Sequence, residues 1–133
     1  MFLLYGCANT NRLAVVNMGR ELKVLSKTFN PEECMRYNLD AACSICLAEA
    51  LVFIDAYEKA KISIPCYLYV DNSYKEVFLY YLESHSQGDE MKILFIDDEY
   101  PYGIEEQGVA FVIDKDGMIL RKLPLCFNGS HRL

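Results

Sequence analysis

Two cysteines, Cys43 and Cys46, are separated by two residues in Cys43-Ser44-Ile45-Cys46. Thiols at this spacing, on the first turn of a helix, are suited to reversible disulfide chemistry. A helix N-terminus offers unpaired N–H groups and a positive dipole end, so a thiolate there is stabilised and its pKa falls below the free value of about 8.5. The second thiol can attack a mixed disulfide formed by the first and release the product. The pair is therefore a candidate redox centre.

The pattern around this pair predicts the elements that must position it. A strand-like run, Met35 to Leu39, precedes the two cysteines. After them, apolar residues recur at three- and four-residue spacing from Leu47 to Lys61, which predicts a helix packed against a sheet. Cys66 to Val70 is a continuous apolar run typical of a buried strand, and Asp71-Asn72-Ser73 then predicts a turn and an N-cap.

Further elements are predicted on either side of this unit. Downstream, a second amphipathic helix is marked by Val77, Tyr80, Tyr81 and Leu82, and a strand by Lys92 to Ile96. The last strands, Val109 to Ile113 and Met118 to Leu123, are joined by Asp114-Lys115-Asp116-Gly117, whose Asp-Gly predicts a hairpin turn. Upstream, the runs Leu13 to Met18 and Glu21 to Leu25, separated by Gly19-Arg20, indicate another hairpin.

Composition excludes several classes of function. With 133 residues, of which 53% are hydrophobic, the chain is long enough for one domain with a core and too short for two ordinary ones. The formal net charge is −6 and no basic run is present, so a nucleic-acid partner is not expected. No stretch approaches the roughly 18 to 20 consecutive apolar residues that span a bilayer.

The remaining cysteines are scattered. Cys66 and Cys126, within or after predicted strands, are interpreted as small buried hydrophobes. Cys34 is either a surface thiol or the partner of a neighbour that the fold brings close. Because the two histidines, His85 and His131, are isolated, no zinc or other metal site is expected.

The N-terminal residues Met1 to Cys7 are similar to the end of a bacterial lipoprotein signal, in which apolar residues and a small residue precede a cysteine that becomes lipidated. No positively charged region precedes them, and the apolar stretch is short. Residues 1–10 are therefore either the remnant of such a signal, with Cys7 as the lipidation candidate, or a first strand. A lipidated Cys7 would anchor the domain at the periplasmic or outer side of a membrane, and without it a cytoplasmic location remains open.

The order strand, Cys-x-x-Cys, helix, strand, helix, strand and hairpin is that of a βαβ unit joined to an antiparallel pair. In this order, and in four segments, the chain resembles the thioredoxin-like superfamily, in particular the extracytoplasmic redoxins of the TlpA and ResA kind. The resemblance covers about residues 35 to 123, most of the chain. It is carried by Ala42-Cys43-Ser44-Ile45-Cys46-Leu47-Ala48-Glu49, Tyr69-Val70-Asp71-Asn72-Ser73, Tyr102-Gly103-Ile104 and Phe111-Val112-Ile113-Asp114-Lys115-Asp116-Gly117-Met118-Ile119.

This resemblance implies a single α/β domain over residues 11–133, with a central mixed sheet, flanking helices and a C-terminal β-hairpin. It also implies a thiol-disulfide oxidoreductase in which Cys43 is the attacking thiolate and Cys46 the resolving thiol. The expected partners are protein thiols and disulfides and a separate redox protein, and no organic cofactor is implied. Such redoxins place a cis-proline before the hairpin, facing the cysteines. Here that substrate-facing position is Gly108, followed by Val109, and glycine does not hold the rare cis bond.

Two other readings are open. Gly108 in place of proline is compatible with a thioredoxin-fold binding module that has lost efficient turnover. Glu49 and Asp71 could instead be the metal-binding carboxylates of a degenerate ribonuclease H-like protein, although the aspartate expected on its first strand, near Cys7, is missing. The acidic cluster 97–99, together with Asp114 and Asp116, is more simply explained as turn and surface charge.

Overall fold

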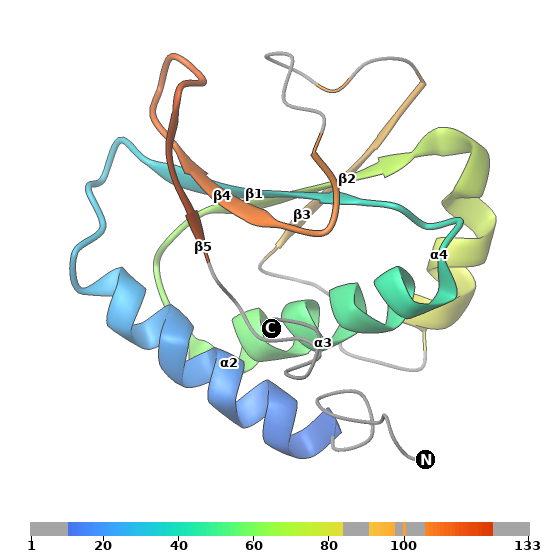
Figure 1. Ribbon diagram of the computed structural model, residues 1–133, viewed down its shortest axis with the longest axis horizontal. Coiled ribbons are helices and arrows are strands. Elements are labelled where there is room, and N and C mark those ends of the chain that lie inside the picture. Colours follow the sequence, from blue (N-terminus) through green and yellow to red (C-terminus); the bar gives the residue numbers. More distant parts are fainter. Residues whose placement is uncertain (1–10, 84–90, 98–99, 101–105, 124–133) are drawn as a thin grey trace.

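The computed structural model describes residues 11–83, 91–97, 100 and 106–123 (Figure 1). These residues form a five-stranded sheet with helices packed against one of its faces. The strand order is β3-β2-β1-β4-β5; β1, β2 and β3 are parallel, whereas β1 and β4, and β4 and β5, pair antiparallel. The predicted α/β class with a central mixed sheet is confirmed.

The sequence order of the elements explains this arrangement. Helix α3 (Ser44–Ala60) connects the parallel neighbours β1 and β2, and a short 3₁₀ turn, η1 (Asn72–Tyr74), leads from β2 into α4 (Lys75–Leu82). Helix α2 (Asn11–Ser26) precedes β1 and packs across α3 (Figure 1). The strands are β1 (Cys34–Leu39), β2 (Cys66–Asp71), β3 (Lys92–Ile96), β4 (Ala110–Ile113) and β5 (Ile119–Leu123).

The main core lies between the sheet and α3. Met35, Tyr37 and Leu39 alternate along β1 and are at most 1% exposed. The Tyr37 ring stacks on Phe53 of α3, with 5.0 Å between the ring centroids. In the parallel register Tyr37 lies beside Leu68 of β2, which is also fully buried. Because these apolar groups are removed from water together, the central strand and α3 hold each other in place.

The opposite face of the sheet is built differently. Here β1 carries Arg36 and Asn38, which are 1% and 0% exposed. The register sets Arg36 between Tyr67 of β2 and Phe111 of β4. A second apolar cluster on this face consists of Phe111, Ile113, Cys34 and Val109. The strand β1 is therefore buried on both faces, with apolar groups towards α3 and two polar side chains on the other side.

Most elements predicted after residue 30 are confirmed to within a few residues. The predicted helix from Leu47 to Lys61 begins earlier, at Ser44, and ends at Ala60. The Asp-Gly hairpin turn is present, because Asp114 N–H donates to the Met118 carbonyl and Gly117 N–H to the Asp114 carbonyl, both at 3.0 Å.

The hairpin predicted for residues 13–25 is wrong, because this segment is the single helix α2. Ala14, Met18 and Leu22 recur every four residues and are at most 3% exposed, which is the pattern of one buried helical face. Gly19 lies inside the helix and does not turn the chain. Packing against α3 outweighs the weak local preference of glycine for a turn.

Several predictions concern residues outside the described part of the chain. They are the segment 1–10 with its lipidation candidate Cys7, the cysteine at position 126, both histidines, and Tyr102-Gly103-Ile104. Among the helices that the structure describes, none combines the length and the apolar character needed to cross a membrane.

The helical assignment of α2 predicts opposite effects for two glycine substitutions. Gly19→Ala should raise the free energy of unfolding by about 0.5 to 1 kcal/mol, because alanine favours a helix interior and no atom lies within 4 Å of the added Cβ. Gly117→Ala should lower it by about 1 to 2 kcal/mol, because residue 117 has φ +84°. Urea unfolding of both variants measures these changes. Destabilisation by Gly19→Ala would instead indicate a turn at this position.

Candidate redox site

The two cysteines lie where β1 ends and α3 begins, at the sheet edge formed by the carboxyl ends of the parallel strands (Figure 1). Between these elements the chain turns at Asp40. The Asp40 carbonyl accepts a hydrogen bond from Cys43 N–H (3.2 Å), and its carboxylate accepts one from Ala42 N–H (3.1 Å). These bonds close a tight loop that holds Cys43 directly before the first turn of α3.

Cys43 is the N-cap residue of α3 and has an extended backbone, with φ −103° and ψ 118°. Its Sγ accepts a hydrogen bond from Cys46 N–H (3.2 Å), and its carbonyl accepts the first helical bond from Leu47 N–H (2.9 Å). The sulfur thus occupies the place that a serine, threonine or aspartate oxygen usually takes at a helix start. The N–H group and the helix dipole both favour negative charge on this atom.

Cys43 and Cys46 form a disulfide, with their Cα atoms 5.1 Å apart. Both residues are half-buried, whereas the adjoining Ala42 and Ser44 are exposed. Ile45, between the cysteines, is 63% exposed. The structure therefore brings the predicted pair together at a place that a thiolate from another molecule can approach.

The predicted substrate-facing residues, Gly108 and Val109, directly precede β4 and lie beside the end of β1. Gly108 N–H donates to the Asn38 carbonyl (2.9 Å). Gly108 has φ +78°, a conformation that strains other residues, and no described peptide bond is cis. Val109 is half-buried and packs in the second apolar cluster. Gly108 therefore lies at the same sheet edge as the cysteine pair, whereas the Val109 side chain has a packing role.

Sequence reasoning missed two buried polar residues near this segment. Arg36 Nε donates to Asn38 Oδ1 (3.1 Å), and Asn38 Nδ2 donates to the Glu106 carbonyl (3.1 Å). The Arg36 guanidinium lies over the Tyr69 ring, 4.4 Å from its centroid. The signal was present in the sequence, because polar groups inside a strand that is covered on both faces must find partners within the protein.

Two further cysteines, Cys34 and Cys66, are free thiols in a different environment. Cys66 is 1% exposed, as expected for a small buried hydrophobe. Burial raises the pKa of its thiol well above the ordinary value, and the charges of Cys34 and Glu58 raise it further. Burial also raises the pKa of the half-buried Cys34, and the positive charge of Arg36 partly offsets this increase. Both thiols therefore stay protonated near neutral pH and are weak nucleophiles.

Of the two carboxylates considered for a metal site, Asp71 has a local role. Asp71 accepts hydrogen bonds from the N–H and hydroxyl of Ser73, both at 2.9 Å, and these bonds lower its pKa. Asp114 accepts two backbone N–H bonds within its hairpin turn. Glu49, the proposed partner of Asp71, lies on α3. In the part of the chain that the structure describes, no group of three or more histidine, cysteine or acidic residues is placed to hold a metal ion.

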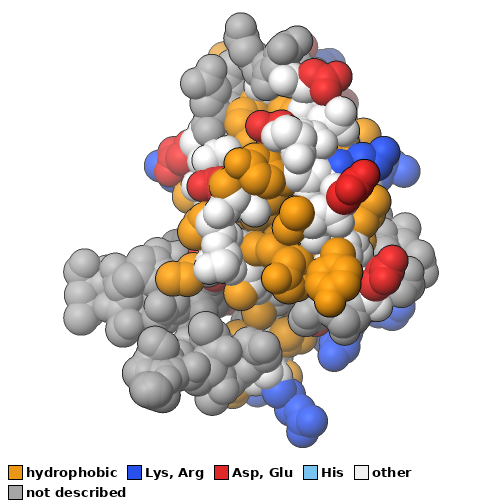
Figure 2. Space-filling model, turned by 90° about the vertical axis from the view of Figure 1, so that its right-hand side faces the viewer, with side chains coloured by type: hydrophobic (Ala, Val, Ile, Leu, Met, Phe, Trp, Pro, Cys, Tyr) orange, Lys and Arg blue, Asp and Glu red, His pale blue; other side chains and the backbone are white. Residues whose placement is uncertain are grey.

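Exposed apolar side chains lie on the face of the molecule where α3 begins. Figure 2 shows the side on which α3 begins and α4 lies, with apolar groups spread across it and acidic groups among them. Tyr80 is the most exposed of these apolar groups on α4, at 72%. The exposed apolar residues of α4 are Val77, Leu79, Tyr80 and Tyr81. Such a surface is suited to contact with the apolar part of another molecule.

The site thus combines a half-buried disulfide with a helix start that favours negative charge on sulfur. Chemically, this arrangement can accept attack by a thiolate and release a thiol in return. No protein-family model matches the chain, and no curated protein is significantly similar to it.

Proposed function

We propose that the protein is a thiol-disulfide oxidoreductase that exchanges disulfides with protein substrates through Cys43 and Cys46. The observation that carries this proposal is the position of the disulfide at the N-cap of α3, where Cys46 N–H is directed at Cys43 Sγ. A sulfur held in this way is stabilised as a thiolate when the disulfide is reduced. Cys43 is therefore the attacking thiol and Cys46 the resolving thiol.

The fold supports the thioredoxin-like part of the proposal. A parallel β1-α3-β2 unit carries the cysteine pair, and the antiparallel β4-β5 hairpin lies on the other side of β1. Three of the four segments that carry the resemblance to the TlpA and ResA redoxins lie at α3, β2 and the β4-β5 hairpin, and the fourth, Tyr102-Gly103-Ile104, lies outside the described residues. The resemblance adds a location in the cell envelope, with Cys7 as a lipid anchor, and a cytoplasmic location is the alternative.

The reaction needs only the two thiols and a substrate disulfide. The Cys43 thiolate attacks one substrate sulfur, forms a mixed disulfide and displaces the other sulfur, which takes up a proton. The Cys46 thiolate then attacks Cys43 Sγ and displaces the first substrate sulfur as a second thiol. The substrate gains two electrons and two protons, and the protein is left with the Cys43–Cys46 disulfide. A separate dithiol protein regenerates the reduced form by the reverse exchange.

A binding module that kept the fold and lost turnover is the alternative, and Gly108 is the residue that favours it. Glycine stands where related redoxins hold a cis-proline against the substrate, and the peptide bonds described here are trans. The two functions differ in one property, because only the enzyme needs a reversible Cys43–Cys46 couple.

The first test is the redox couple itself. The protein is equilibrated in glutathione buffers, free thiols are alkylated, and the Cys43–Cys46 peptide is analysed by mass spectrometry. The expected result is a reversible two-electron transition, with about 30 mV for each tenfold change in the ratio of the two forms. Cys34→Ser serves as the control, because it removes a third thiol. Thiols that stay in one state over the whole range would exclude the oxidoreductase and leave the binding module.

The order of attack is tested with single cysteine variants and the small aromatic disulfide dithiobis(nitrobenzoate). In a Cys34→Ser background, reduced Cys46→Ser should retain one thionitrobenzoate on Cys43, because no resolving thiol releases it. The parent protein should release both aromatic thiols and form its own disulfide. Mass spectrometry measures the adduct. A stable adduct on Cys46 in the Cys43→Ser variant, formed equally fast, would reverse the assigned roles.

The free thiols provide a pH test. Because the pKa values of Cys34 and Cys66 are raised, both stay protonated at neutral pH, and their alkylation should accelerate only above the ordinary thiol range. In the reduced protein, iodoacetamide at pH 7 should therefore modify Cys43 before Cys34 and Cys66. Peptide mass spectrometry over a pH series measures each rate. Faster modification of Cys34 than of Cys43 at pH 7 would contradict the activation of Cys43.

A further inference from the structure

We propose that Asn38 is a positioning residue that holds Glu106 to Gly108 at the sheet edge where the cysteine pair lies, so that the polypeptide around the substrate disulfide can dock on an ordered segment. This inference rests on the proposed disulfide exchange with protein substrates, and what it adds is the role of Asn38 in that exchange. It concerns the described residues of β1 and the segment before β4. One buried residue, Asn38, makes hydrogen bonds to two residues of that segment.

Asn38 binds the segment through both its backbone and its side chain. Its carbonyl accepts from Gly108 N–H (2.9 Å), and its Nδ2 donates to the Glu106 carbonyl (3.1 Å). Asn38 is fully buried near the end of β1, and Asp40, which follows shortly after, holds the loop of Cys43. The same short stretch of chain therefore fixes the segment on one side and the reactive cysteine on the other.

Arg36 sets the orientation of the Asn38 amide. Arg36 Nε donates to Asn38 Oδ1 (3.1 Å), which leaves the amide N–H groups to face Glu106. A flipped amide would direct its own donors at the guanidinium. Arg36 is itself held over the Tyr69 ring, at 4.4 Å, and is 1% exposed. Since Arg36 and Asn38 are both buried, this orientation of the amide matters, and it satisfies the Arg36 donor and the Glu106 carbonyl together.

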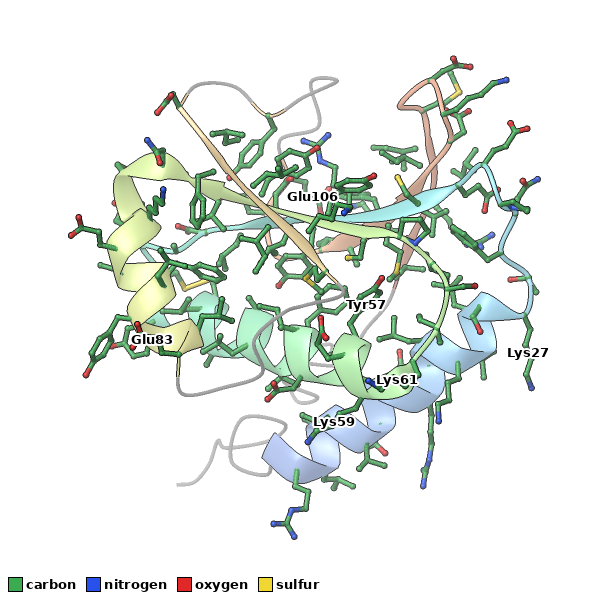
Figure 3. The ribbon with its side chains drawn as sticks, turned by 180° about the vertical axis from the view of Figure 1, so that it is seen from behind. Lys27, Tyr57, Lys59, Lys61, Glu83 and Glu106 are labelled. Atoms are coloured by element: carbon green, nitrogen blue, oxygen red, sulfur yellow. A yellow bond between two sulfur atoms is a disulfide. The ribbon has the colours of Figure 1, made fainter. Side chains whose placement is uncertain are left out.

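Two surface contacts hold the segment from outside. Lys122 of β5 pairs with the Glu106 carboxylate (2.9 Å), and Gln107 Nε2 donates to the Tyr100 hydroxyl (2.8 Å). Both contacts are exposed, so water and salt compete with them. Figure 3 shows Glu106 above the sheet, on the side away from α3. The hydrogen bonds of Asn38, which is itself fully buried, are less accessible to water and are therefore the ones that fix the backbone.

Gly108 is the reason why hydrogen bonds are needed to fix the backbone of this segment. Glycine has the widest conformational freedom of all residues, and its φ of +78° is one of many values open to it. A proline at this place would fix the backbone covalently, whereas here hydrogen bonds to Asn38 fix it. A small disulfide needs only access to the sulfurs. A polypeptide also needs an ordered backbone beside them, so loss of the Asn38 contacts should act on polypeptide binding.

The test uses Asn38→Asp, with insulin as the protein disulfide and dithiothreitol as the electron donor. The carboxylate keeps an acceptor for Arg36 but loses the donor to Glu106 and faces its carbonyl oxygen. The expected result is a rise in KM for insulin of about fivefold or more, with kcat changed by less than about twofold. Asn30→Asp is the matched control, because it adds the same charge in the turn before β1 and keeps the oxygen that accepts from Glu32 N–H.

Each outcome separates the two proposals. Turnover by the parent protein with an unchanged KM in Asn38→Asp would overturn the positioning role and leave the oxidoreductase intact. Equal losses in kcat and in thermal stability would show a purely structural role and would also overturn it. If Asn38→Asp does not fold, Asn38→Ser removes the same donor without adding charge and is judged by the same split between KM and kcat. Absence of turnover in the parent, with a Cys43–Cys46 couple that does not titrate, would overturn both proposals.

Discussion

The strand β1 is hydrogen-bonded on both edges and buried on both faces, and each part of the candidate site is attached to it. Its apolar side packs on α3 through Tyr37 and Phe53. Its far end leads through Asp40 to Cys43, and its Asn38 binds the segment before β4. A strand with no free edge and no exposed face has little freedom to shift register. The relative positions of the cysteines and Gly108 therefore follow from one rigid element.

Burial separates the described cysteines into two kinds. Cys43 and Cys46 stand at a helix start, where backbone N–H groups and partial exposure favour charge on sulfur. Cys66 lies within the sheet, where desolvation keeps the thiol neutral. Cys34 lies between these extremes, with a guanidinium nearby that partly offsets its desolvation. Chemically identical side chains thus differ in reactivity because they differ in burial and in the backbone around them. This difference limits unwanted thiol–disulfide exchange among them.

The parts of the structure that depend on local pattern were predictable from the sequence. The Cys-x-x-Cys pair before an apolar-periodic helix, the buried strand at Cys66 and the Asp-Gly hairpin each have a short-range cause. The helix α2 was not predicted, because Gly19 is a turn signal locally and only contact with α3 decides for the helix. The Arg36–Asn38 pair was missed for a related reason. Its partners, Tyr69 and the Glu106 carbonyl, come from distant parts of the chain and become neighbours only through the sheet.

The capping role of Cys43 Sγ has a thermodynamic consequence. A thiolate is a stronger hydrogen-bond acceptor than a disulfide sulfur, so the N-cap of α3 is stronger in the reduced protein. The stability of α3 and the reduction of the Cys43–Cys46 disulfide are then linked, because any extra cap stability in the dithiol form also favours reduction. Each 1.4 kcal/mol gained in this way makes the couple more oxidising by about 30 mV. The strength of one hydrogen bond at the start of α3 therefore contributes to the reduction potential of the Cys43–Cys46 couple.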